Sequence, residues 1–442
     1  MTTNPRLPGL HPSARVATAL FASLFTLTVG SAASAAGLFD SVADTAGAQA
    51  ESTPAAAVRS RIVTIDLDYL NANLAPSGID KASDRLSRAP QESSAQIELF
   101  DDTSVSLTRD SLKKAQGGGY VWTGSLQGRD GFGTLVISGD RVTGYIQDGL
   151  DTYEIKPLSG GLHRISEIDS SRFPGDIVVP APYRLPFGAS PDDASDLSAP
   201  QGKTTITVLI PFTKKAKKES ADIKGDANLA ISLANTALKS SGVKQKYKLV
   251  GTMKVKKYKE AGDDVAGFSK DLDNLATNKG KFKPVHKKRD KKKADLVALL
   301  RKRSTIACGV GYFVENPTPA DAIWGFSVTT HNCVTNHSVA HEMGHNSGLE
   351  HDRYQVALEG GGNPPKTEYN FGHVNTNARV RSIMAYNREC ADSGFNCTRV
   401  PMYSTPDKKY QGDKIGIKKG KTGAADAGRR LDDTKGAISK YR

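Results

Sequence analysis

The sequence predicts an α/β domain in the C-terminal half of the chain, preceded by a separate β-rich region. Apolar strands alternate with amphipathic helical segments after residue 203, whereas residues 62–173 hold short alternating segments between Gly- and Asp-containing turns. The 442 residues exceed one typical domain. Residues 1–200 carry 16 Lys and Arg against 23 Asp and Glu, a net charge of −7, and residues 201–442 carry 44 against 24, a net charge of +20. This asymmetry predicts two domains that associate electrostatically.

The N-terminus has the features of an export signal. Arg6 and Arg15 precede the apolar run 16–30, and Ala33-Ser34-Ala35 offers a cleavage site, so residues 1–35 are predicted to be a signal peptide. The run is shorter than the roughly 20 apolar residues that a membrane span needs, and an uncleaved anchor is the alternative. We therefore expect a secreted, extracellular protein without stable membrane insertion.

Residues 36–173 are predicted to form the β-rich region, and the Pro-, Ser- and Asp-rich residues 174–203 an exposed linker. The region has no cysteine and a single histidine, His163, so it is poor in catalytic side chains. The predicted strands are IVTIDLDYL (62–70), YVWTGSL (120–126), GTLVISG (133–139), RVTGYI (141–146) and DTYEIKPL (151–158).

Residues 204–442 are predicted to form one sheet covered by helices. The predicted strands are TTITVLIPFT (204–213), YKLVGTMKV (247–255), ADLVALL (294–300) and IWGFSV (323–328). The predicted helices are residues 226–241, 264–280 and 426–442.

A lysine-rich run, KGKFKPVHKKRDKKK, occupies residues 279–293. Nucleic-acid binding is one interpretation of such a run. Little aromatic interleaving and no recognition motif accompany it, so a solvated helix face or loop is favoured, and we expect no nucleic-acid partner.

Four cysteines fit an oxidising compartment, and they allow three pairings. The nearest-neighbour choice, Cys308 with Cys333 and Cys390 with Cys397, closes two loops that flank residues 339–352. A cysteine zinc cluster is the competing interpretation, but no C-x-x-C occurs in the chain.

The stretch VAHEMGHNSGLEHD, residues 339–352, predicts a catalytic zinc site. His341 and His345 are four residues apart and lie on one face of a helix, where both imidazoles reach one ion. Glu342 then projects beside the metal, close enough to hold a water molecule. Gly348 allows the chain to leave the helix, and the turn returns His351 as a third ligand. Three protein ligands leave a zinc coordination position open for water, as in catalytic sites.

These residues resemble the metzincin metalloproteases, whose zinc signature H-E-x-x-H-x-x-G-x-x-H matches HEMGHNSGLEH, residues 341–351. That clan also has a tight turn around a methionine beneath the zinc, and Met384 within SIMAY (382–386) matches it. The resemblance covers about residues 204–442. It implies a mixed sheet, an active-site helix and a Met-turn, one catalytic Zn²⁺, and the hydrolysis of protein or peptide substrates.

Two further residues separate the branches of the clan. Asp352 after the third histidine resembles the reprolysin branch, where that aspartate anchors the site. Tyr386 in Met-x-Tyr resembles astacins and serralysins, in which the tyrosine approaches the zinc as a switchable ligand; a core aromatic is the equal alternative. The combination is most similar to bacterial secreted reprolysin-like proteases, including the peptidyl-Asp metalloendopeptidases.

The resemblance implies that Glu342 accepts a proton from the attacking water, with zinc and Tyr386 stabilising the oxyanion. A catalytically inactive binding or adhesion protein on the same fold is the competing hypothesis, although the intact Glu342 argues against it. The basic half of the chain predicts acidic substrates. Arg388 follows the Met-turn, where the clan shapes the pocket for the residue after the cleaved bond. It is either the group that favours Asp or Glu there or an exposed arginine.

The β-rich region is predicted to be a propeptide that inhibits its own protease domain. Many metzincins silence zinc with a propeptide cysteine, but the first cysteine here is Cys308, which excludes that device. Astacin propeptides use the aspartate of an F-x-G-D motif, and FPGD (173–176) has this form. Asp176 is therefore the candidate latency residue, and an ordinary turn is the alternative.

Overall fold

The computed structural model describes residues 37–42, 53–75, 94–180 and 202–442. The predicted signal peptide lies outside the described residues, as does most of the predicted linker. Among the described residues, no helix has the length and apolar character needed to cross a membrane.

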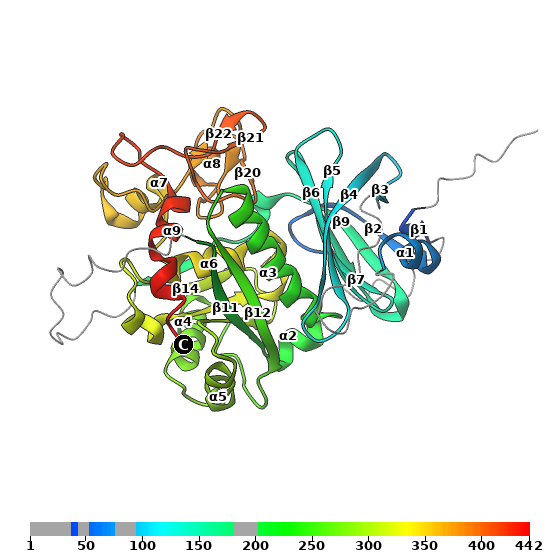
Figure 1. The fold of residues 1–442 in the computed structure, drawn as a ribbon, viewed down its shortest axis with the longest axis horizontal. Helices are drawn as coiled ribbons and strands as arrows, with labels where there is room; N and C mark the ends of the chain where they lie inside the picture. The colour runs from blue at the N-terminus through cyan, green and yellow to red at the C-terminus, as the bar shows by residue number, and fades with distance from the viewer. Residues whose placement is uncertain (1–36, 43–52, 76–93, 181–201) are drawn as a thin grey trace, which may run out of the picture. The chain divides into compact units, whose positions relative to one another are not determined.

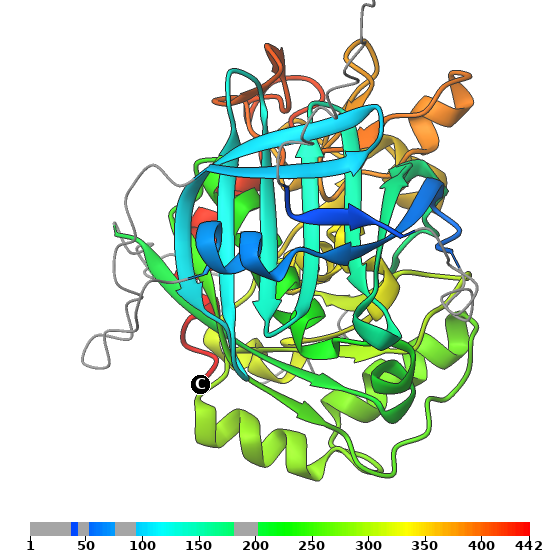
Figure 2. The ribbon, with the colours of Figure 1, turned by 90° about the vertical axis from the view of Figure 1, so that its right-hand side faces the viewer.

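The N-terminal region, defined here as residues 37–180, is built on a nine-stranded antiparallel sheet in the order β1-β2-β9-β8-β7-β6-β5-β4-β3. Figure 2 shows its cyan strands side by side. Alternate side chains of these strands are buried in one apolar cluster around the fully buried Trp122. The strands are β1 (Phe39–Ser41), β2 (Ala57–Ile65), β3 (Ser94–Phe100), β4 (Thr103–Lys114), β5 (Tyr120–Leu126), β6 (Gly131–Ser138), β7 (Arg141–Asp148), β8 (Asp151–Pro157) and β9 (His163–Ile168).

The first predicted strand is too long at its C-terminal end. β2 ends at Ile65, and helix α1 (Leu67–Asn73) follows. The carboxylate of Asp66 accepts a hydrogen bond from the Tyr69 backbone N–H at 2.8 Å, which is the side-chain cap that begins a helix. The apolar run IVTIDLDYL therefore belongs to two elements and not to one.

The second sheet is six-stranded and mixed, in the order β10-β14-β15-β13-β11-β12. Five of its strands belong to the C-terminal region, residues 202–442, and β10 comes from the N-terminal region. β14 runs antiparallel to β15, and the other neighbouring pairs are parallel. Figure 1 shows β11 and β12 beside helix α3 (Ile223–Ser240), which packs on them. The strands are β10 (Ile177–Pro180), β11 (Thr204–Phe212), β12 (Gln245–Lys254), β13 (Leu296–Arg301), β14 (Gly309–Phe313) and β15 (Phe326–Thr330).

Short elements complete the C-terminal region. The helices are α2 (Lys214–Glu219), α3 (Ile223–Ser240), α4 (Val265–Ala276), α5 (Lys283–Lys292), α6 (Ser338–Asn346), α7 (Arg353–Val356), α8 (Arg388–Asp392) and α9 (Ala427–Ile438). The small sheets pair β16 (Glu350–Asp352) with β17 (Phe371–Gly372), join β18 (Val374–Asn375), β19 (Val380–Arg381) and β20 (Thr398–Arg399), and pair β21 (Lys409–Tyr410) with β22 (Asp413–Lys414).

The helix predicted at 226–241 begins three residues earlier, at Ile223, and the helix predicted at 264–280 begins at Val265. The carboxylates of Asp222 and Asp264 accept hydrogen bonds from the backbone N–H groups of Gly225 and Gly267, at the starts of α3 and α4. The predicted strand IWGFSV is correct only in its second half. Ile323 and Trp324 belong to a short 3-10 helix, Pro319–Trp324, that Thr318 and Asp321 cap reciprocally.

The linker prediction is wrong for the residues that can be described. Ile177–Pro180 form strand β10, which pairs in parallel with β14 at the edge of the C-terminal sheet. The prediction rests on the many Pro, Ser and Asp residues in this stretch. It therefore overlooks the short apolar run Ile177-Val178-Val179, which forms the strand. Ile177 and Val179 pack on the apolar cluster of the C-terminal sheet.

The lysine-rich run forms helix α5, as one of its two interpretations predicts. Val285 and Arg289 are buried and anchor the helix, while most of its lysines are exposed. The Arg289 guanidinium donates to the backbone carbonyls of Ala294, Asp295 and Ala322. The run is therefore a solvated helix face held by two inward-facing side chains.

Acid is expected to loosen the N-terminal sheet through His163. Burial lowers the pKa of this imidazole to about 4, and its Nε2 accepts a hydrogen bond from the Val142 N–H at 3.0 Å. A pKa lowered from 6.5 favours the neutral form in the folded state. The contribution to stability is thus complete above pH 6.5 and is lost as the pH falls toward 4.

Between pH 7 and pH 5 the loss amounts to about 2 kcal/mol of unfolding free energy. Urea unfolding of wild type and of His163→Gln at both pH values measures it, because glutamine retains an acceptor and does not titrate. The wild type should lose about 2 kcal/mol more than the variant over this range. An equal loss in both proteins would show that His163 does not control acid stability.

Candidate active site

Helix α6 carries the first two histidines of the motif on one face. His341 and His345 are both fully buried, and their Nε2 atoms lie 3.0 Å apart. Each ring is oriented from its other nitrogen: His341 Nδ1 donates to the Ile383 carbonyl at 2.9 Å, and His345 Nδ1 donates to the Leu349 carbonyl at 2.8 Å. These bonds place the proton on Nδ1, so the Nε2 lone pairs face each other.

A left-handed turn after α6 returns the third histidine. Gly348 has φ +90°, and a Cβ there would lie 2.9 Å from the Glu315 carbonyl oxygen, so the position requires glycine. The turn leads into β16, and the centroid of the His351 ring lies 5.3 Å from that of His341 and 4.8 Å from that of His345. His351 Nε2 is buried and has no hydrogen-bond partner among the described residues.

The three imidazoles fit a metal ion. One nitrogen from each of His341, His345 and His351 lies within 4.8 Å of the others. Burial lowers the pKa of His341 and of His345 well below its usual range, which keeps these rings neutral as ligands must be. A buried nitrogen without a partner, beside two others with fixed tautomers, is a donor set typical of zinc.

Glu342 lies beside this histidine group on the side of β14. Its side chain is fully buried, and neither carboxylate oxygen has a hydrogen-bond partner among the described residues. It packs so closely on the strand that a Cβ at Gly309 would lie 2.4 Å from Oε1. Burial, and then the neighbouring Asp176, raises the pKa of Glu342 well above its usual range.

Met384, the methionine of the predicted Met-turn, packs against α6. Met384 is fully buried, and a Cβ added to Gly344 of α6 would lie 2.7 Å from its sulfur. Asp352 ties this turn to the third histidine, because its carboxylate accepts from the Tyr386 N–H at 2.9 Å and from the Gln355 N–H at 3.0 Å. Met384 thus packs against α6, and Asp352 joins the segment after His351 to the backbone of Tyr386.

Tyr386 lies against the histidines but its hydroxyl is occupied. The ring centroid is 4.4 Å from that of His351 and 6.0 Å from that of His341. The hydroxyl donates to the backbone carbonyl of Asp176, from the N-terminal region. The aromatic ring is therefore at the site, in contact with the segment that precedes β10.

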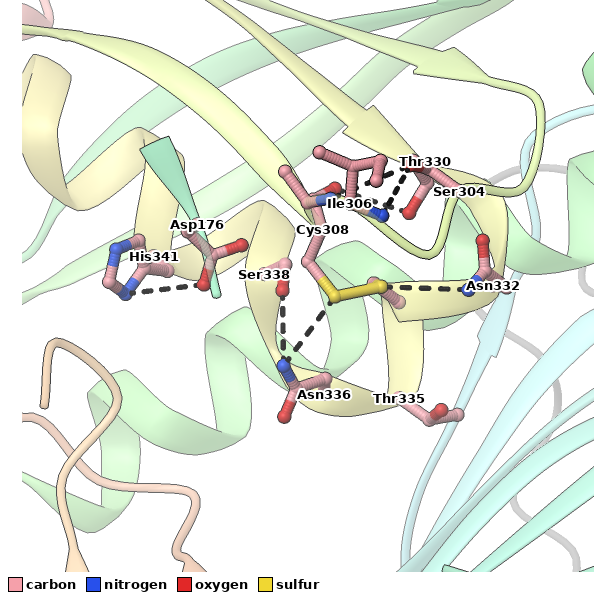
Figure 3. The surroundings of a disulfide bond; sticks show 12 residues. Asp176, Ser304, Ile306, Cys308, Thr330, Asn332, Thr335, Asn336, Ser338 and His341 are labelled. Atoms are coloured by element: carbon pink, nitrogen blue, oxygen red, sulfur yellow. Dashed lines mark hydrogen bonds and ion pairs between the residues drawn. A yellow bond between two sulfur atoms is a disulfide. The ribbon is translucent and has the colours of Figure 1, made fainter. Parts of the chain in front are cut away.

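Asp176 is buried at the centre of the site. One of its carboxylate oxygens lies 4.0 Å from His341 Nδ1 and 3.4 Å from the Arg399 guanidinium. Figure 3 marks the contact between Asp176 and His341 with a dashed line. A carboxylate oxygen of Asp176, one of Glu342 and a ring nitrogen of His341 lie within 4.8 Å of one another. The aspartate of the FPGD stretch, which the sequence analysis singles out, thus lies next to the histidine group.

Both nearest-neighbour disulfides are present and both border the site. Cys308–Cys333 ties the start of β14 to the turn that leads into α6, and Figure 3 shows Asn336 donating to Cys308 Sγ and to Ser338. Cys390–Cys397 closes the loop between the Met-turn and β20. The bridges thus tie down the start of β14, where Gly309 packs on Glu342, and the loop that follows Tyr386.

Arg388 does not join the site. Its side chain is 59 % exposed, and its guanidinium pairs with Asp392 at 2.8 Å on the same helix, α8. The arginines that do reach the site are Arg381 and Arg399, which follow valine and threonine in strands β19 and β20. Each has an exposed fraction of only 3 %. Both arginines are missed by the sequence analysis. Their strands have only two residues each, which is too short for an alternation of inward- and outward-facing side chains to be recognised.

Comparisons with known proteins agree with the geometry. Residues 225–352 match the model of the reprolysin-like metallopeptidase family M12B, a range that includes α6, the three histidines and Asp352. The chain is 29 % identical over 444 residues to a peptidyl-Asp metalloendopeptidase of Stenotrophomonas maltophilia strain R551-3, covering 94 % of this chain and 96 % of that protein. It is 28 % identical to a peptidyl-Asp metalloendopeptidase of Xanthomonas campestris pv. campestris, over 80 % of this chain and 83 % of that protein.

Among solved structures, metalloproteinase-II from Bacteroides fragilis matches with a TM-score of 0.43 and 14 % identity, over 72 % of this chain and 90 % of that chain. A likeness of this size carries no argument about mechanism. The motif-bearing residues 225–352 and the relatives that match across most of the chain carry the assignment.

Proposed function

Because this chain is a reprolysin-like metalloendopeptidase, we propose that it is an exported zinc enzyme, made as a latent precursor, that cleaves proteins beside aspartate residues. The observation that carries this proposal is the convergence of three buried imidazoles beside the buried carboxyl of Glu342. His341, His345 and His351 would hold one Zn²⁺, with the ring orientations set from Ile383 and Leu349.

The mechanism divides between the ion and the chain. A bound zinc ion would activate water and polarise the scissile carbonyl. Glu342 accepts a proton from the attacking water on a carboxylate oxygen and then delivers it to the leaving nitrogen, as the water oxygen bonds to the carbonyl carbon and the C–N bond breaks. Tyr386, once its hydroxyl leaves the Asp176 carbonyl, donates a hydrogen bond to the developing oxyanion.

Burial is the first cause of the raised pKa of Glu342, and the neighbouring Asp176 is the second. Asp176 adds a second buried carboxyl beside it, and two such groups do not both ionise readily. Removal of Asp176 lowers the pKa of Glu342 toward the range in which it accepts a proton. The loss of that neighbour thus removes one of the causes that disfavour the carboxylate form of Glu342.

The N-terminal region is proposed to be an inhibitory propeptide. Three features support this role: β10 pairs with β14, the Asp176 carboxylate lies against the catalytic groups, and the Tyr386 hydroxyl is held by the Asp176 carbonyl. Departure of β10 frees the edge of β14, on which an extended substrate peptide can add as a strand. The same segment therefore blocks both the chemical groups and the strand that would receive substrate.

Export is proposed from the N-terminal sequence and the disulfides. Residues 1–35 have the composition of a signal peptide, and all four cysteines are paired. Disulfides persist in oxidising compartments and are rare in the cytosol. The preference for aspartate is carried over from the names of the relatives, and the net charge of the C-terminal half favours acidic substrates.

Chelation tests the proposal against an inactive binding protein on the same fold. The secreted protein should hydrolyse casein, lose that activity after dialysis against a zinc chelator, and regain it with one equivalent of Zn²⁺. Thermal unfolding should shift upward when the ion returns, because binding only the folded state stabilises it. Zinc binding without any hydrolysis of casein would favour the binding protein.

A further inference from the structure

Two arginines lie directly opposite each other beside the candidate active site. Arg381 of β19 and Arg399 of β20 are register partners on parallel strands, and each is 3 % exposed. Like charges at opposed positions destabilise a sheet, and burying a guanidinium is costly unless its charge and its N–H groups are compensated. This arrangement therefore requires an anion or many acceptors nearby.

Backbone carbonyls surround Arg381, two of them from the C-terminal region and one, that of Ser170, from the N-terminal region. Its guanidinium and Nε donate to the carbonyls of Cys397 at 3.1 Å, Ala385 at 2.8 Å and Ser170 at 3.0 Å. Burial, followed by the charge of Arg399, lowers the pKa of Arg381 well below its usual range. Arg381 therefore binds the backbone of the loop that follows Met384, at Ala385 and Cys397. Arg399 is the guanidinium that pairs with the carboxylate of Asp176 beside His341.

Arg399 is incompletely satisfied by the C-terminal region alone. It donates to the Asn336 carbonyl at 3.0 Å and to the Ala385 carbonyl at 3.4 Å, while its buried Nε has no partner among the described residues. Within the described part of the chain, the carboxylate that forms an ion pair with Arg399 is that of Asp176, at 3.4 Å. If the N-terminal region departs, a buried cation loses its carboxylate.

Asp176 lies there as a residue of an extended peptide. Its backbone carbonyl accepts from the Tyr386 hydroxyl, and the preceding carbonyl, of Gly175, accepts from the Cys308 N–H at 2.9 Å. β10 follows immediately. The main chain is thus bound on both sides, and a side chain with a single methylene brings the carboxylate to Arg399 and within 4.0 Å of His341 Nδ1.

We propose that Arg399 is the residue that recognises the aspartate of the substrate, and that Asp176 occupies this subsite in the precursor as an intramolecular substitute. The inference rests on the proposed endopeptidase function. The Arg399 subsite comprises the guanidinium, the neighbouring Arg381 and the carbonyls of Asn336 and Ala385. A substrate aspartate restores the ion pair that is lost with Asp176, beside the groups that cleave the bond. The short reach of Asp176 favours aspartate over glutamate.

Arg388 is the competing specificity residue. It follows the Met-turn in sequence, but it is exposed and already paired with Asp392. An exposed ion pair contributes little binding energy, whereas a buried guanidinium that lacks an anion discriminates strongly for a carboxylate. Arg388→Gln is therefore the matched control for Arg399→Gln.

The test compares three peptides that differ at one position, which is Asp, Asn or Glu, together with denatured casein. The zinc-loaded, activated wild type should cleave the Asp peptide with a kcat/KM about 10- to 100-fold above that of the Asn peptide. Arg399→Gln should reduce this ratio to within about 2-fold by lowering kcat/KM for the Asp peptide, and Arg388→Gln should keep the wild-type ratio.

A wild-type ratio in Arg399→Gln, with casein hydrolysis intact, overturns this inference alone. A wild type that cleaves neither casein nor any peptide overturns the proposed function as well. If Arg399→Gln does not fold, an inhibition experiment on the wild-type protein tests the inference instead. A blocked peptide with one Asp should inhibit casein hydrolysis at a concentration about 10-fold or more below its Asn analogue. Equal inhibition by the two peptides contradicts the inference.

Discussion

Replacing Glu342 with alanine is expected to abolish proteolysis and to leave the metal bound. Glu342 is not one of the three histidines whose imidazoles fit the ion. The carbonyls of Ile383 and Leu349 orient two of these rings without any contribution from Glu342. Removing a general base lowers turnover by about 10²- to 10⁴-fold. The folded state should tolerate the change, because the buried carboxyl has no hydrogen-bond partner among the described residues whose loss would be costly.

Casein hydrolysis and zinc content, measured on the same preparations, check this prediction. Glu389→Ala, on α8 beyond the Met-turn, is the matched control and should behave as wild type. Wild-type turnover in Glu342→Ala would remove Glu342 from the mechanism. Loss of zinc together with activity would assign Glu342 to binding the metal.

Replacing Asp176 with asparagine is expected to make the precursor active before it is processed. The substitution removes the negative charge that pairs with Arg399 and leaves the rest of the side chain nearly unchanged. A charge-assisted hydrogen bond contributes about 1.5–3 kcal/mol, so the open, uninhibited state becomes about 10- to 100-fold more populated. The unprocessed Asp176→Asn precursor should therefore hydrolyse casein faster than the wild-type precursor by the same factor.

Asp169→Asn is the control for this experiment. Asp169 also belongs to the N-terminal region, where its carboxylate accepts from the Ser171 N–H and contacts Arg172, away from the histidine group. Each of the two variants, Asp176→Asn and Asp169→Asn, is also prepared with the additional substitution Glu342→Ala. Casein hydrolysis that persists in these double variants comes from a contaminating protease. Equal latency of Asp176→Asn and wild type would contradict the assignment of Asp176.

The centre of the site could be predicted because local spacing decides it. His341 and His345 share a helix face, and Gly348 provides the turn that returns His351, so eleven consecutive residues determine most of the geometry. The disulfide pairing also follows from short sequence separations, 25 and 7 residues, although three pairings are formally open.

The surroundings of the site could not be predicted because they depend on long-range pairing. Asp176 and Arg399 are separated by 223 positions, and their contact requires β10 to add to the edge of β14. The two-residue strand β20 has no periodicity to reveal that Arg399 faces inward. Sequence proximity to the Met-turn favours Arg388 instead, but helix α8 turns that side chain to solvent and toward Asp392.

The central claim, a zinc endopeptidase that residues up to Asp176 keep latent, is tested most directly by the N-terminal sequence of the species that hydrolyses casein. Fractions of the secreted protein are separated by size, assayed, and sequenced from the N-terminus. The account predicts that the active species begins after Pro180 and before Thr204, and that the full-length wild-type precursor is inactive. An active species that still carries Asp176, joined without a break to the C-terminal region, would contradict it.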